Sequence, residues 1–260
     1  MSMTTGIEGN LTVNDAGGLQ DIIAAINPHS ATLNVSVDNA DVTAFSSTPP
    51  VAASTAIGIS AWTITLAARF PTTAAFGKCG NVTYANGYVV GPKAWSMAIA
   101  CAVHESTAFA STCPTYASFV PGMISATGSY TCYIDSATSL AAAATSGNAT
   151  FRLTDETTVD NTLACAINSI QKSAVVNVGA GNDVTYNFAA NGNITAAGDS
   201  TLFPAGALAK PDTAEVVLRA AGSKTYTGDA FWSAVNISVP VRGLIDVGMT
   251  LQGTGDLTIA

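Results

Sequence analysis

The chain has 260 residues, enough for one large domain or two of ordinary size, and either could bury a core without help from disulfides. Hydrophobic residues make up 48% of it and charged residues only 10%, and the net charge is −8 at pH 7. The nine lysines and arginines are scattered singly, which excludes a basic surface of the kind that grips nucleic acid. An acidic surface that lets DNA slide past is compatible with this balance.

The N-terminal residues 1–10 contain neither a basic region nor an apolar core, so no signal peptide is expected and the protein is predicted to be made and assembled in a cytoplasm. The longest apolar stretch, Ala56 to Phe70, is interrupted by Ser and Thr and is too short to span a bilayer. No membrane partner is therefore expected.

Short strands with alternating apolar residues, separated by Gly, Pro and Asn turns, predict an all-β sandwich or barrel. One or two short helices interrupt the pattern. Leu19, Ile22, Ile23 and Ile26 have helical spacing between Asp15 and Pro28, and residues 139–145 form a second candidate that ends at Gly147. The clearest strands are Trp62–Leu66, Tyr130–Tyr133, Val184–Phe188 and Phe231–Val241.

The first half of the chain contains a repeat, since residues 43–50 return 64 residues later as residues 107–114. Upstream of it, apolar residues alternate in both copies, which predicts a half-buried strand in each. Downstream, a shift of one residue aligns Ile59 with Ile124. The corresponding strand residues are Leu33, Val35 and Val37 in one copy and Met97, Ile99 and Cys101 in the other, and Gly9–Val13 resembles Gly80–Tyr84.

A second repeat lies in the other half, where Val184–Thr195 aligns with Val247–Thr258 at an offset of 63. Ala166-Ile167-Asn168 similarly matches Ala234-Val235-Asn236. The order along the chain is therefore first half, first half, second half, second half. We predict a discontinuous outer module, 1–79 and 200–260, around an inserted inner module, 80–199. A swapped pairing of the halves fits the sequence equally well.

Residues that could carry chemistry are few. His29 follows Pro28 in a turn and His104 lies beside Glu105 at a strand end, so both are predicted to be surface residues. Asp155 and Glu156 are predicted on a solvated turn, and Gly179–Asp183 is predicted as a hairpin turn and not a phosphate loop. We expect no catalytic, cofactor-binding or metal site, and no enzyme.

The cysteines do not form a metal or redox motif. Their odd number leaves one unpaired in any full disulfide scheme, and none shows CxxC spacing. We predict free buried thiols, with a disulfide at Cys113 left open. The five are Cys79, Cys101, Cys113, Cys132 and Cys165.

The C-terminal stretch Val247–Thr258 resembles the last strand of bacteriophage tail tube proteins, in which an apolar-alternating strand runs into a Gly-Thr-Gly-x-Leu-Thr finish. Ala94–Ile99 resembles the early Trp-Ser strand of the same family, and Gly122–Tyr133 resembles its following Pro-Gly and Thr-Gly-Ser segment. These matches cover about half the chain, and the order of the motifs carries the likeness.

The resemblance implies two tail-tube-like β-sandwich or barrel modules in one chain, and a structural protein of the virion tail. Three copies would then close the pseudo-hexameric ring that six ordinary subunits form. Stacked rings would make a hollow conduit for DNA ejection, with acidic residues lining the lumen and DNA passing without specific binding. The implied partners are further copies of the chain and other tail proteins, namely the terminator, the tape measure and the baseplate or tip.

Two other classes compete with this interpretation. One is another virion β-sandwich protein, such as a neck, tail terminator or head decoration protein. The other is a carbohydrate-binding or adhesive β-sandwich, which would usually expose clustered aromatic residues. Trp62, Trp95 and Trp232 all lie in strand-like alternation and are predicted to be core or interface residues.

Overall fold

The computed structural model describes residues 2–5, 9–14, 19–20, 23, 28–41, 55–69, 81–84, 88–90, 92–108, 114–134, 146–152, 161–173, 182–196, 211–220, 224–240 and 244–260. Fourteen strands form one antiparallel sheet in this part of the chain, so the prediction of a β protein is confirmed. They are β1 (Ser2–Thr5), β2 (Gly9–Asn14), β3 (Pro28–Asp41), β4 (Thr55–Arg69), β5 (Asn81–Tyr84), β6 (Tyr88–Val90), β7 (Pro92–Glu105), β8 (Phe119–Ile134), β9 (Ser146–Arg152), β10 (Asn161–Ser173), β11 (Asn182–Ala196), β12 (Ala214–Arg219), β13 (Thr225–Pro240) and β14 (Asp246–Ile259).

No complete helix is among the described elements. Of the first helix predicted from sequence, only Leu19, Gln20 and Ile23 are described; their backbone is helical, and Leu19 and Ile23 are buried. The second predicted helix, residues 139–145, lies outside the described residues, as do the octamer at 43–50 and most of its copy.

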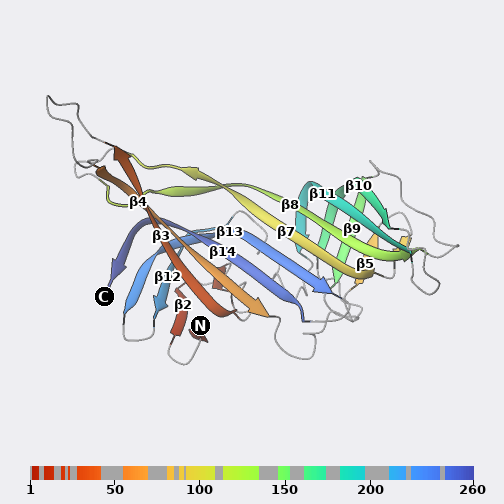
Figure 1. Cartoon of the computed structure of the whole chain (residues 1–260), viewed down its shortest axis with the longest axis horizontal. Coiled ribbons are helices and arrows are strands. Elements are labelled where there is room, and N and C mark those ends of the chain that lie inside the picture. The colour runs from red at the N-terminus through yellow and green to blue at the C-terminus, as the bar shows by residue number, and fades with distance from the viewer. Residues whose placement is uncertain are drawn as a thin grey trace, which may run out of the picture.

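The strands pair in two sets that have the same order. One set runs β2-β12-β13-β14-β4-β3, and the other runs β5-β9-β10-β11-β8-β7. The two sets meet where β13 pairs with β7, between Ala234–Pro240 and Ala94–Ala100. One sheet therefore runs through both sets, from β1 to β6, and β14, β4 and β3 branch from it at β13 (Figure 1).

The core lies where each set of strands curls back on itself. Alternate residues of the long strands are buried, as the pleat requires, and the shorter strands cover them from the other side. In one set, Phe151 of β9 packs against Trp95 of β7 and Phe188 of β11, with ring centroids 5.3 and 4.9 Å apart. Trp62, Trp95 and Trp232 are 1%, 3% and 2% exposed, so their prediction as core residues is confirmed.

The predicted half-buried strands differ from each other. In β7, Met97, Ile99 and Cys101 are buried, which confirms the prediction for that strand. In β3, Val35 and Val37 are 49% and 41% exposed, so half-burial is wrong for the outer part of that strand. The physical reason is the neighbourhood: β7 lies between β8 and β13, whereas β4 is the one strand that pairs with β3 among the described residues.

The strand registers differ from the sequence alignment at two places. Val37 lies opposite Ser60 and Cys101 lies opposite Ile124, whereas the alignment matches Ile59 with Ile124. Likewise, Ile167 lies opposite Phe188 and Trp232 lies opposite Leu251, whereas the alignment matches Ile167 with Val235. In a chain so rich in Ala, Ser and Thr, short identities do not fix strand register.

Candidate functional surfaces

The residues considered for catalysis do not form a site in the described part of the chain. His29 and His104 are both exposed, as predicted for surface residues. Asp155, Glu156 and Gly179–Gly181 lie outside the described residues, and Asn182 and Asp183 begin β11. Among the residues described, no three His, Cys, Asp or Glu side chains gather as a metal site would require.

Two cysteines have described side chains, Cys101 and Cys132. Both are buried, as predicted for core thiols. Burial is the main cause that raises the pKa of Cys132 from 9.0 to about 11, and the nearby charge of Asp183 contributes to the same rise. A thiol with this pKa stays protonated at neutral pH and is a poor nucleophile. Cys79 and Cys113 lie outside the described residues, and the side chain of Cys165 is not described.

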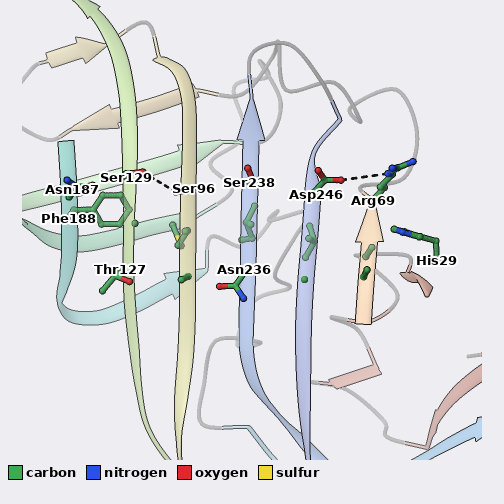
Figure 2. Close-up of a pocket in the computed structure, with 18 residues that line it drawn as sticks. His29, Arg69, Ser96, Thr127, Ser129, Asn187, Phe188, Asn236, Ser238 and Asp246 are labelled. Atoms are coloured by element: carbon green, nitrogen blue, oxygen red, sulfur yellow. Dashed lines mark hydrogen bonds and ion pairs between the residues drawn. The ribbon is translucent and has the colours of Figure 1, made fainter. Parts of the chain in front are cut away.

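A shallow trough of about 820 Å³ crosses the middle of the sheet, over β4, β14, β13, β7, β8 and β11 (Figure 2). Much of its surface comes from small, uncharged side chains that alternate with the buried ones, and the buried residues Met97, Phe188, Ile237 and Val247 also line it. Ser96 and Ser129 face each other from adjacent strands, with their hydroxyl oxygens 3.1 Å apart. Other such side chains are Ala67, Ala98, Thr127, Asn187, Asn236 and Ser238.

Charges near the trough occur in opposite pairs. At one end, Arg69 Nε lies 3.7 Å from Asp246 Oδ1, and both side chains are mostly exposed. At the start of β11, Lys93 Nζ donates hydrogen bonds of 2.9 and 2.8 Å to the two carboxylate oxygens of Asp183. The exposed Arg69–Asp246 pair adds little stability, whereas the Lys93–Asp183 pair is partly buried. In each pair the opposite charges largely cancel, and salt at 0.1 M screens what remains beyond about 10 Å.

A second surface lies on two long hairpins, β3–β4 and β7–β8, which extend from the core on the same side of the molecule (Figure 1). Six of the seven large apolar residues that are exposed in the described part of the chain lie on these hairpins. Ile57 and Met123 are the most exposed, at 81% and 84%, and the other four are Val35, Val37, Val103 and Val120. Clustered exposed apolar residues are typical of a surface that contacts another protein.

The hairpins are held together by the chain between Thr115 and Phe119. Ser60 of β4 donates its N–H to the Thr115 carbonyl (2.9 Å) and accepts from the Ala117 N–H (2.7 Å). On the other side, Thr254 Oγ1 accepts from the Phe119 N–H at 2.8 Å and donates to its carbonyl at 2.9 Å. This segment therefore ties the β7–β8 hairpin to β4 and β14.

The two glycines of the Gly-Thr-Gly sequence near the C-terminus, Gly253 and Gly255, are each required by their surroundings or backbone conformation. A Cβ at Gly253 would lie 2.1 Å from Cδ2 and Cε2 of Trp62, so no larger residue fits there beside the tryptophan. Gly255 has a φ of 70°, which favours glycine. Its N–H donates to the Ala117 carbonyl at 3.0 Å, and its carbonyl accepts from Trp62 Nε1 at 3.1 Å.

Besides the short strands β1 and β6, which end the sheet and each pair on one side only, β3 and β10 have edges without a partner in the described part of the chain. β3 pairs with β4 on one side only. β10 pairs with β11 along its length, but β9 covers its other side only from Asn161 to Ala166, which leaves residues 167–173 open on that side. Open edges carry unpaired backbone N–H and C=O groups and so invite pairing with another strand.

No helix of the described residues is long and apolar enough to cross a membrane. Comparisons with protein-family models, with curated proteins and with solved structures find no match to this chain.

Proposed function

We propose that this protein is the subunit of a phage tail tube, a virion protein that polymerises into stacked rings around a conduit for DNA. The observation that carries the proposal is the continuous sheet, which runs through both strand sets and has a concave face of mostly small side chains, where the charges of Arg69 and Asp246 are paired (Figure 2). The resemblance of Val247–Thr258 and Ala94–Ile99 to tail tube strands adds to it.

The proposal includes an internal duplication, with each strand set being one tube module. Its support is that both sets have the same order of pairing and the same registers. Val35 lies opposite Trp62 and Ile99 opposite Ala126, both displaced by 64 residues, and both hairpins have a bulge two residues further along. Residues 9–69 pair with 214–259, and residues 81–134 pair with 146–196, which favours nested modules over swapped halves.

In this proposal the concave face lines the lumen. DNA then passes a surface of hydroxyl, amide and methyl groups, whose few nearby charges are paired. This differs from the expectation of an acidic lining that repels DNA. Small neutral side chains offer phosphates neither a cation to bind nor a carboxylate to approach.

Electron microscopy of the purified, concentrated protein tests the proposal. We expect rings or tubes with threefold or pseudo-sixfold symmetry, and a ring mass of three chains by light scattering. A monomer at all concentrations and salts, with no ring or tube in micrographs, would contradict the proposal. Closed rings that never stack would instead favour a terminator.

A further inference from the structure

The junction between β13 and β7 shows how one strand set continues into the other. Val235 lies opposite Ile99 and Asn236 opposite Ala98, in an antiparallel pairing that covers seven residues of each strand. The second side of β13 changes partner along its length, from β12 at residues 225–230 to β7 at residues 234–240.

The open edges of β3 and β10 hold the positions in the strand order that β7 and β13 hold at this junction. β3 has the place in one set that β7 has in the other, and β10 has the place of β13. Just as β12 covers the first residues of β13, β9 covers the second side of β10 up to Ala166. At the offset between the two strands, residues 169–173 in the open part of β10 correspond to residues 234–238 of β13, which pair with β7.

The apolar side chains of β3 are exposed to the extent expected for a strand that lacks a neighbour on one side. Val35 is 49% exposed whereas Ile99, at the corresponding position of β7, is 1% exposed; Val37 and Cys101 are 41% and 4% exposed. The residue types still alternate as in a covered strand. An edge this long, with exposed β-branched residues, is a surface that natural proteins normally pair or cover.

We infer that β10 of one protomer pairs with β3 of the next, in the register that β13 and β7 have within the chain. β13 and β10 correspond at an offset of 65 residues, since Trp232 and Ile167 lie opposite Leu251 and Phe188. β7 and β3 correspond at 64. The register therefore places Ile170 opposite Val35, Gln171 opposite Asn34 and Ser173 opposite Thr32.

This inference rests on the proposed function and names the lateral partner, a second copy of the chain. Each chain supplies eight strands to the barrel, in the order β3-β4-β14-β13-β7-β8-β11-β10, so three chains close a barrel in which β3 and β10 no longer have open edges. The side chains at the junction between protomers are not a full copy of the internal junction, because Lys172 stands where β13 has Ile237. The backbone ladder does not depend on that difference.

A cysteine pair tests the register. Opposite residues of an antiparallel pair have Cα atoms about 4.5–5.5 Å apart, within the range of a disulfide. After oxidation of the assembled protein, Asn34→Cys/Gln171→Cys should give dimers and trimers on a non-reducing gel and no larger species. The matched variant Ala98→Cys/Asn236→Cys should close the corresponding bond inside one chain and run as a monomer.

Two controls accompany the pair. Asn34→Cys/Ser173→Cys, displaced along the strand, should crosslink at least about tenfold less, because diagonal neighbours are about 7–8 Å apart. In the wild-type chain, assembly should slow hydrogen exchange at residues 30–37 and 169–173, which checks the interface without substitutions. Rings that form without protection of these amides and without the Asn34–Gln171 crosslink would overturn the inference and leave the proposed function intact. Absence of any ring would overturn both.

Discussion

At the scale of residues, the charges around the trough occur in opposite pairs. Arg69 and Lys93 are each matched by a carboxylate, of Asp246 and Asp183. The Arg69–Asp246 pair is exposed, and an exposed ion pair contributes less than about 1 kcal/mol, so this pair does not hold the fold together. In the proposed function, both pairs keep two cations from attracting phosphates.

Replacing both acids should therefore create affinity for DNA. We expect Asp183→Lys/Asp246→Lys to bind a short duplex at least about tenfold more tightly than wild type at roughly 50 mM salt, with affinity falling as salt rises. Fluorescence anisotropy measures this. Asp229→Lys/Asp256→Lys makes the same change in net charge on the far halves of β13 and β14. Equal affinity in both double variants would mean that only net charge counts.

A second residue-scale prediction concerns Trp62 and Gly253. The added Cβ of Gly253→Ala overlaps the Trp62 ring, so we expect a loss of about 1–3 kcal/mol in the free energy of unfolding. Trp62→Ala alone should cost about 3–5 kcal/mol. At the corresponding positions of the other strand set stand Ala126 and Ala190, a combination without the clash.

The double variant should consequently show coupling. With alanine at position 62, Gly253→Ala should cost less than about 0.5 kcal/mol, because the ring that it overlapped is gone. Urea unfolding of the four proteins measures the cycle. Additive losses would show that Gly253 is required for its backbone conformation and not for its contact with Trp62.

At the scale of elements, the two hairpins combine a rigid attachment with an apolar outer surface. Hydrogen bonds from Ser60 and Thr254 hold the Thr115–Phe119 segment, so the hairpins do not depend on a partner for their position. Ile57 and Met123 point away from the core. In the proposed function these residues contact another copy of the chain.

Making the hairpins polar should weaken assembly without harming the fold. We expect Ile57→Ser/Met123→Ser to keep the wild-type unfolding midpoint, since both side chains are more than 80% exposed. The concentration needed for rings or tubes should rise at least about tenfold, because two apolar contacts worth about 1 kcal/mol each are lost. Light scattering over a dilution series measures it. Unchanged assembly would show that these residues face solvent in the assembled form.

At the scale of the whole molecule, alternation in the sequence was sufficient for the β class and for the strands at Trp62–Leu66 and Val184–Phe188. These strands depend on local residue order, which is visible in one sequence.

What could not be predicted depends on which strands become neighbours. Val35 and Val37 have the pattern of buried residues, and only the lack of a strand beside β3 exposes them. The Thr115–Phe119 segment makes its hydrogen bonds with residues far along the chain and has no local signal. The face that forms the trough likewise follows from register, which alternation alone leaves open.

The β13–β7 junction lies within one chain, and this has a consequence for how a ring would nucleate. Half of the lateral contacts then form during folding, at an effective concentration that dilution cannot lower. Ring closure by three chains requires two bimolecular encounters, where six separate subunits would require five. A ring of this kind should therefore persist at protein concentrations at which a six-subunit ring with contacts of equal strength would already have dissociated.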